Sequence, residues 1–105
     1  MICVLTKKMQ NKIENLPNIQ EILKKNNVKI NKALGQNFIF DLNITDKIVK
    51  KSDQFASTII EIGSGPGSLT RSILKNKSAV VYAIDKDIQS KAMLADLKNI
   101  YKDRL

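Results

Sequence analysis

Three glycines at alternate positions follow directly on an apolar run, and this combination restricts the possible folds of the chain more than any other feature. Residues 59–62 read Ile-Ile-Glu-Ile and lead into Gly63, Gly65 and Gly67, after which a helical pattern begins. A short apolar run that ends in glycines is typical of a buried strand turning sharply into a helix. Glycine suits such a turn because it adopts positive φ and carries no Cβ to keep a ligand from the backbone. The stretch predicts a nucleotide-type binding loop.

A second apolar run and an acid extend this pattern. Residues 79–84 have strand length, and the helical pattern of residues 69–76 joins them to the glycine stretch. Strand, helix and strand in this order form a βαβ unit with parallel strands, for which we expect helices on the faces and an unpaired outer edge on the second strand. Asp85 lies 85 − 63 = 22 positions after Gly63. An acid at a spacing of about 20 residues bonds ribose hydroxyls, so the pattern indicates an adenosine-containing cofactor.

Two kinds of adenosine cofactor remain open at this point. Dinucleotide enzymes carry a third glycine at the sixth position of G-x-G-x-x-G, where this chain has Ser68. Glu61 stands two residues before the first glycine, and a carboxylate there suits a cofactor with a cationic end better than one with a diphosphate. The two residues favour S-adenosylmethionine over a nicotinamide dinucleotide.

Helix signals lie on both sides of the glycine stretch. Asn18, with Glu21 three residues later, predicts a capped helix that ends near Asn26 and Asn27. The following residues, 28–40, fit no period and predict a packed loop.

Two further helices are predicted, over residues 41–52 and residues 88–100. Asn43 is the expected cap of the first and Asp87 of the second. The expected core residues are Ile44, Ile48 and Val49 in the first helix, and Leu94, Leu97 and Tyr101 in the second.

Composition limits the function classes. The 105 residues are 43% hydrophobic and 27% charged, which is ordinary for one small globular domain or part of a larger one. The single cysteine, Cys3, and the absence of histidine exclude an internal disulfide and a His/Cys metal site. No apolar run approaches the ~18 to 20 residues of a membrane span, so we expect a cytoplasmic protein. The formal charge of +8 favours an anionic partner such as nucleic acid, although a lysine-rich genome composition explains it equally well.

Three segments of the chain resemble the N-terminal part of bacterial small-subunit ribosomal RNA adenine dimethyltransferases. They are K-A-L-G-Q-N-F-I (residues 32–39), D-L-N-I-T (residues 41–45) and E-I-G-S-G-P-G-S-L-T (residues 61–70). The L-G-Q-N-F element is more specific than the glycine loop. The resemblance runs from about Leu16 to Leu105 and leaves residues 1–15 as a basic N-terminal arm.

The resemblance implies an α/β fold, a truncated class I (Rossmann-like) methyltransferase of N-terminal helices plus the first βαβ unit. Residues 16–105 would be the incomplete N-terminal part of a domain that binds S-adenosyl-L-methionine. The implied reaction is dimethylation of N6 of two adjacent adenines near the 3′ end of 16S rRNA, in the small ribosomal subunit. A monomer without a metal ion is expected.

Site residues follow from the same resemblance. Asn37 and Ile39 are expected to contact the cofactor, Gly63 to lie under its methionine portion, and Asp85 to hold its ribose. The other cofactor-binding candidates are Gln36, Glu61, Gly65 and Gly67. The sequence departs from the family at Ser64, where proline is usual, and at Asp85, where glutamate is commoner.

Catalytic residues are not expected within the chain. The family's N-L-P-Y motif, which orients the target adenine, lies beyond Leu105, as does the next cofactor-binding acid. We therefore expect a marginally stable protein that is inactive alone. Two other interpretations stay open: a non-enzymatic RNA-binding remnant and, less favoured, part of a nicotinamide-dependent oxidoreductase.

Overall fold

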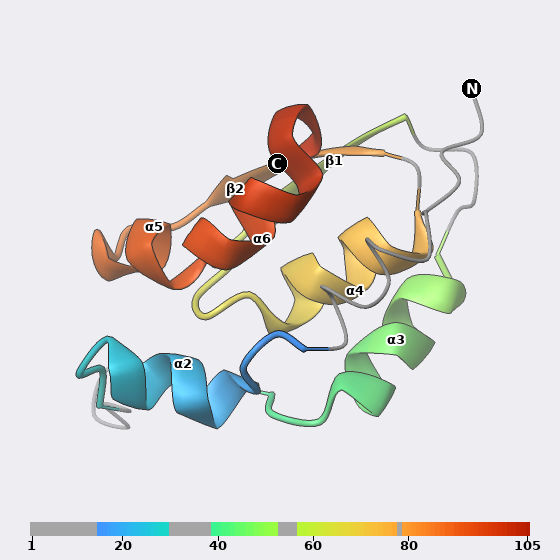
Figure 1. The fold of residues 1–105 in the computed structure, drawn as a ribbon. Coiled ribbons are helices and arrows are strands. Elements are labelled where there is room, and N and C mark those ends of the chain that lie inside the picture. The colour runs from blue at the N-terminus through green and yellow to red at the C-terminus, as the bar shows by residue number, and fades with distance from the viewer. Residues whose placement is uncertain (1–14, 30–38, 53–56, 78) are drawn as a thin grey trace.

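The computed structural model describes residues 15–29, 39–52, 57–77 and 79–105. Its elements are α2 (Ile19–Lys25), α3 (Leu42–Lys50), β1 (Thr58–Ile62), α4 (Ser68–Asn76), β2 (Val80–Ile84), α5 (Gln89–Met93), α6 (Ala95–Tyr101) and the 3-10 helix η2 (Lys102–Arg104) (Figure 1). The α/β class is confirmed, with a parallel pair of strands joined through a helix. The predicted basic arm lies, except for its last residue, outside the described residues.

The two strands bury one face of their sheet and expose the other. They pair in parallel register, with Ile60 opposite Tyr82 and Ile62 opposite Ile84. The inner face packs on the helices with Ile59, Glu61, Val81 and Ala83. The outer face consists of Ile60, Ile62, Tyr82 and Ile84, all exposed. The helices of the described residues cover only the inner face.

Helix α2 begins and ends as the sequence predicts. The Asn18 side-chain oxygen accepts from the Glu21 N–H (2.9 Å), and the Glu21 carboxylate accepts from the Asn18 N–H (3.1 Å). Asn27 takes a positive φ of 55° directly after the helix, as asparagine does at helix ends. The buried Arg71 of α4 holds the start of α2 by donating to the Pro17 carbonyl (2.9 Å).

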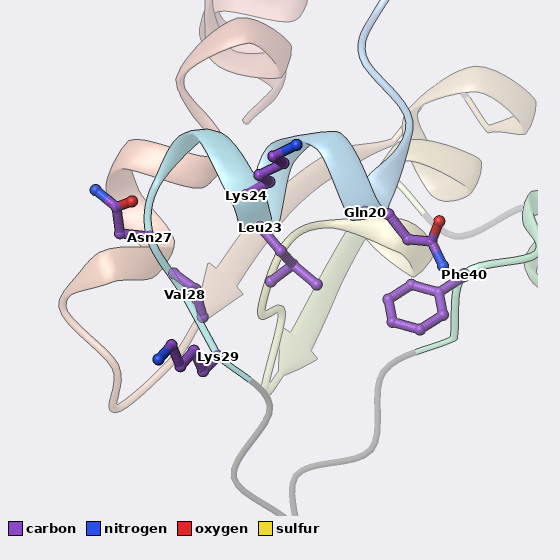
Figure 2. Close-up of a pocket in the computed structure, with 7 residues that line it drawn as sticks. All are labelled: Gln20, Leu23, Lys24, Asn27, Val28, Lys29 and Phe40. Atoms are coloured by element: carbon purple, nitrogen blue, oxygen red, sulfur yellow. The ribbon is translucent and has the colours of Figure 1, made fainter.

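A hollow of about 600 Å³ lies against α2 (Figure 2). It is lined by Gln20, Leu23, Lys24, Asn27, Val28, Lys29 and Phe40. None of these residues is among the predicted cofactor residues, although Phe40 directly follows one of them, Ile39.

Helix α3 differs from its prediction in both its cap and its buried face. Asp41 caps it in place of Asn43, because the Asp41 carboxylate accepts from the Asn43 N–H (2.9 Å). Thr45 and Val49 are buried, whereas the predicted core residues Ile44 and Ile48 are about half exposed. The reason is a polar contact, since the Thr45 hydroxyl lies 2.6 Å from the Ser72 hydroxyl of α4. The Thr45 side chain therefore occupies the buried face of α3, where the apolar pattern predicts Ile44 and Ile48.

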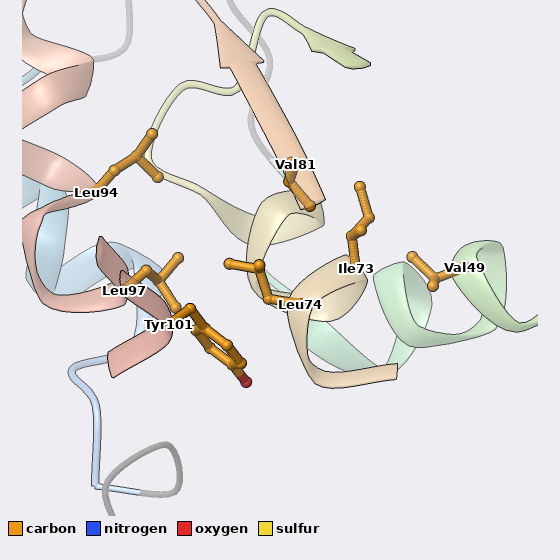
Figure 3. Packing of buried hydrophobic residues seen from close by; sticks show 7 residues of the cluster. All are labelled: Val49, Ile73, Leu74, Val81, Leu94, Leu97 and Tyr101. Atoms are coloured by element: carbon orange, nitrogen blue, oxygen red, sulfur yellow. The ribbon is translucent and has the colours of Figure 1, made fainter. Parts of the chain in front are cut away.

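The main core joins α3, α4, β2 and the last helices. Figure 3 shows its members: Val49, Ile73, Leu74, Val81, Leu94, Leu97 and Tyr101. The predicted inward face of the last helical region is confirmed, but one continuous helix over residues 88–100 is wrong. The helix breaks at Leu94 into α5 and α6. The Leu94 side chain lies directly beside Gly67 at the start of α4. The residue at which the helix breaks therefore also packs on the glycine loop.

The C-terminal turn is fastened to the core by Arg104. Its guanidinium donates to the carbonyls of Ala79 (3.1 Å), Leu74 (3.2 Å) and Lys77. It also lies 5.2 Å from the centre of the Tyr101 ring, within the range of a cation–π interaction. The Arg104 side chain thus forms hydrogen bonds with carbonyls at the end of α4 and just before β2. These bonds tie together the two ends of the connection between α4 and β2.

Replacing Arg104 with methionine keeps the apolar stem and removes these hydrogen bonds. We expect Arg104→Met to lower the free energy of unfolding by about 1–3 kcal/mol, measured by urea denaturation. The control is Lys91→Met on α5, where an exposed lysine is lost and the change stays within about 0.5 kcal/mol. Equal stabilities of the two variants would show that the Arg104 bonds contribute nothing net.

Candidate functional site

The glycine loop lies at the carboxyl ends of both strands. Its three glycines adopt positive φ: 78° at Gly63, 53° at Gly65 and 93° at Gly67. The Gly63 N–H donates to the Ile84 carbonyl (2.6 Å), so the loop leaves β1 while still attached to β2. It then enters α4 at Ser68. The carboxyl ends of parallel strands, facing a helix N-terminus, are where open α/β sheets bind ligands.

Asp85 is joined directly to this loop. One carboxylate oxygen accepts from the Gly65 N–H (2.7 Å) and the other from the Asp87 N–H (2.8 Å). Burial alone would raise the pKa of Asp85, but the hydrogen bonds from the Asp87 and Gly65 N–H groups lower it below the ordinary value. Asp85 is therefore ionised at neutral pH and places a negative charge beside the glycine loop, as the sequence spacing predicts.

The glycines at the two ends of the loop have different surroundings. A Cβ at Gly63 would meet nothing within 4 Å, whereas a Cβ at Gly67 would lie 2.5 Å from Leu94 Cδ2 and 3.3 Å from Leu97 Cδ1. Gly67 therefore allows α6 to pack closely on α4. Gly63 is exposed and offers bare backbone beside open space, so of these two positions it is the one a ligand can approach.

Glu61 is not on the open side of the loop. It is buried on the inner face of β1, where the Thr70 hydroxyl of α4 donates to its carboxylate. Burial raises the pKa of Glu61, the Thr70 bond partly offsets this, and the nearby Asp85 charge raises the pKa further. The observed contact braces β1 against the first turn of α4, and binding of a cationic group by Glu61 stays a prediction.

Ile39 is brought to the loop from far upstream. The Ser68 hydroxyl donates to the Ile39 carbonyl (2.5 Å), across 29 positions of sequence. Sequence reasoning used Ser68 only as an argument against a dinucleotide and missed this tie. A hydroxyl in the first turn of a helix that follows a glycine loop was the available signal. Gln36 and Asn37, the two amide residues predicted to contact the cofactor, lie outside the described residues.

The described part of the chain holds neither a metal-binding cluster nor a membrane-spanning helix. Among residues 15–29, 39–52, 57–77 and 79–105, no three Asp or Glu side chains gather closely enough to hold a metal ion. Within the same ranges no helix has the length and apolar character that crossing a bilayer requires. The glycine loop, Asp85 and Ile39 are thus the candidate site.

The two glycine environments predict unequal effects of alanine. Gly63→Ala should lower the free energy of unfolding by about 1–2 kcal/mol, because the only cost is the strain of an alanine at positive φ. Gly67→Ala should lower it by about 2–5 kcal/mol, because the new methyl group also displaces Leu94 in a packed core. Thermal and urea denaturation of the matched pair measures the difference. Equal destabilisation would contradict the assignment of Gly67 to helix packing.

The raised pKa of Glu61 predicts a pH-dependent stability difference. A carboxyl whose folded pKa is raised destabilises the fold above that pKa, and the penalty disappears as pH falls towards the ordinary value of 4.5. The stability of Glu61→Gln relative to wild type should therefore be greatest near pH 7 and should decline as pH falls. Asp85 is present in both proteins, and its charge is one cause of the raised Glu61 pKa, so the difference reports the two coupled carboxyls together. A difference that does not change with pH would contradict the raised pKa.

Comparisons with known proteins agree with this geometry. The family model for ribosomal RNA adenine dimethylase matches residues 27–99, which include the glycine loop and Asp85. Ribosomal RNA small subunit methyltransferase A of Mesorhizobium japonicum is 40% identical over 89% of this chain, and that of Agrobacterium fabrum is 38% identical over the same share. The chain spans about a third (34%) of the length of each relative. The chain belongs to the ribosomal RNA adenine dimethylase family.

Proposed function

We propose that this chain carries the first half of an S-adenosyl-L-methionine site. The observation that carries the proposal is the Asp85 carboxylate, which lies 2.7 Å from the Gly65 N–H beside the open backbone of Gly63. A carboxylate accepts from both hydroxyls of a ribose, and bare glycine backbone accommodates the adjoining part of an adenosine cofactor. Membership of a methyltransferase family supports the methionine form of the cofactor over a dinucleotide.

Each predicted residue then has a binding role. Asp85 holds the ribose, Gly63 lies beneath the methionine portion, and Gly65 fixes the loop through its N–H. Ile39, together with Gln36 and Asn37, contacts the cofactor from the upstream loop. Gly67 and Glu61 stay cofactor-binding candidates of the same proposal, although their observed contacts are packing against Leu94 and a hydrogen bond from the Thr70 hydroxyl. The cofactor supplies an activated methyl group on its sulfonium, so the protein contributes orientation.

The proposed substrate of the complete site is N6 of two adjacent adenines near the 3′ end of 16S rRNA. No N-L-P-Y sequence occurs among the 105 residues, and we assign no catalytic residue to the chain. We therefore infer that it binds cofactor weakly and, alone, transfers no methyl group to rRNA. A cytoplasmic monomer is part of the same proposal.

Cofactor binding can be tested with S-adenosylhomocysteine by isothermal titration calorimetry. Binding should be detectable, NAD should not compete, and Asp85→Ala should weaken binding at least tenfold, because charge-assisted hydrogen bonds are lost. Asp87→Ala is the matched control, since Asp87 also accepts a backbone N–H, from Gln89 (2.9 Å), but is not predicted to touch the cofactor. Equal weakening by both variants, or preference for NAD, would overturn the assignment.

The exposed lysines of α2 and α3 favour one alternative function, RNA binding without catalysis. Lys24 and Lys25 on α2, and Lys47, Lys50 and Lys51 at the end of α3, are all exposed. This alternative predicts RNA binding that weakens steeply with salt and survives Gly63→Val and Asp85→Ala. Filter binding of a 16S rRNA 3′ fragment at several salt concentrations separates it from a function centred on the cofactor site.

A further inference from the structure

The hollow against α2 has the size of a ligand site (Figure 2). Its volume of about 600 Å³ lies within the range of about 300–1,000 Å³ that small-molecule sites occupy. The buried Leu23 and the half-buried Val28 contribute its apolar lining. None of the residues that line it is a cofactor candidate, so the proposed cofactor binding leaves this hollow without a role.

The turn that ends α2 forms one wall of the hollow. The Asn27 N–H donates to the Lys24 carbonyl (3.1 Å), and the Val28 N–H donates to the Leu23 carbonyl (2.9 Å). Asn27 has a φ of 55°, which reverses the chain at the helix end. Val28 and Lys29 therefore line the same hollow as the helix residues Leu23 and Lys24. Backbone hydrogen bonds thus fix this wall.

Phe40 lines the hollow from a different segment of the chain. Its neighbours in sequence are both anchored: the Ile39 carbonyl accepts from the Ser68 hydroxyl (2.5 Å), and the Asp41 carboxylate accepts from the Asn43 N–H (2.9 Å). The Phe40 side chain is nevertheless 37% exposed. An aromatic ring on an anchored backbone, with part of its surface uncovered, offers a stacking partner to a flat ligand.

Polar side chains surround this apolar lining. Gln20, Lys24 and Lys29 are exposed, and none of their side chains takes part in a hydrogen bond or ion pair within the part of the chain that the structure describes. The described residues that line the hollow include no Asp or Glu, so its lining carries two positive charges. Figure 2 shows Gln20 and Phe40 toward one end of the hollow and Lys29 toward the other.

We propose that the hollow binds one unpaired nucleotide of a single-stranded RNA. The base stacks on the Phe40 ring, with the Gln20 amide beside its polar edge, and the phosphates lie against Lys24 and Lys29. Aromatic stacking, hydrogen bonds to the base edge and lysine–phosphate contacts are the interactions by which proteins bind unpaired nucleotides. Two separate lysines suit the phosphates on both sides of a nucleotide within a strand, whereas a free mononucleotide carries one phosphate group.

The test is fluorescence anisotropy of a labelled single-stranded oligoadenylate with the full 105-residue chain. We expect saturable binding that weakens as salt is added, because lysine–phosphate contacts release counterions. An abasic oligonucleotide of the same length keeps the phosphates and lacks the bases, so it should compete at least tenfold more weakly. AMP should also compete more weakly than the unlabelled oligoadenylate.

Substitutions of Phe40 test the stacking. Phe40→Ala should weaken oligoadenylate binding about tenfold, because base–aromatic stacking is lost. Phe40→Tyr keeps an aromatic ring and should retain the wild-type affinity, which separates stacking from a general effect of altering this position. Tyr82→Ala is the matched control, since it removes an exposed aromatic side chain (59%) from β2, outside the hollow. It should leave the affinity unchanged.

Two neighbouring lysines test the phosphate contacts. Lys24 and Lys25 are both exposed in the last turn of α2, but only Lys24 lines the hollow. Lys24→Gln should weaken binding severalfold and reduce the salt dependence, whereas Lys25→Gln should have a clearly smaller effect. Asp85→Ala should leave oligoadenylate binding unchanged, so failure of this proposal is distinguishable from failure of the proposed cofactor binding.

Several results would overturn the proposal. One is absence of oligoadenylate binding at low salt, and another is competition by the abasic oligonucleotide as strong as that by oligoadenylate. Equal losses of affinity in Phe40→Ala and Tyr82→Ala, or in Lys24→Gln and Lys25→Gln, would remove the hollow as the binding site. Competition by AMP as strong as that by oligoadenylate would overturn RNA as the source of the nucleotide.

Discussion

The hydrogen bond between the Asp85 carboxylate and the Gly65 N–H (2.7 Å) is the contact on which the candidate site depends. It joins the end of β2 to the loop that follows β1, across 20 positions of sequence. Because the loop glycines adopt positive φ, the loop has few conformational restraints of its own. The carboxylate supplies the missing restraint, and its second oxygen fixes the start of the next segment through the Asp87 N–H.

This restraint also defines what a ligand would encounter. Both Asp85 oxygens already accept backbone N–H groups, one from Gly65 and the other from Asp87. A ribose bound here would therefore meet a carboxylate that already restrains the loop. Because the aspartate side chain is short and already bonded to the Gly65 N–H, a ligand that it bound would lie close to the glycine backbone.

Local sequence signals predicted the elements whose stability is local. The capping box of Asn18 and Glu21, the two strands, the glycine loop and the position of Asp85 are all found as expected. Apart from the cap of α3, where Asp41 stands in place of the predicted Asn43, the errors occur where a residue distant in sequence makes the deciding contact. The Thr45–Ser72 contact selects the buried face of α3, packing at Gly67 accompanies the break at Leu94, and Ser68 binds the Ile39 carbonyl. No pattern within a single segment specifies these pairings.

The distribution of polarity across the sheet shows why the chain is expected to be only marginally stable. A carboxyl group with a raised pKa, Glu61, lies on the buried face, whereas its neighbours Ile60 and Ile62 point outward. Leaving a large apolar side chain exposed forgoes roughly 1.5–3 kcal/mol compared with burying it. The four outward side chains of the sheet are 51–83% exposed, so each forgoes part of this contribution, against the ~5–15 kcal/mol that stabilises a typical domain. The same alternation that buries Glu61 thus leaves Ile60, Ile62, Tyr82 and Ile84 on the exposed face of the sheet.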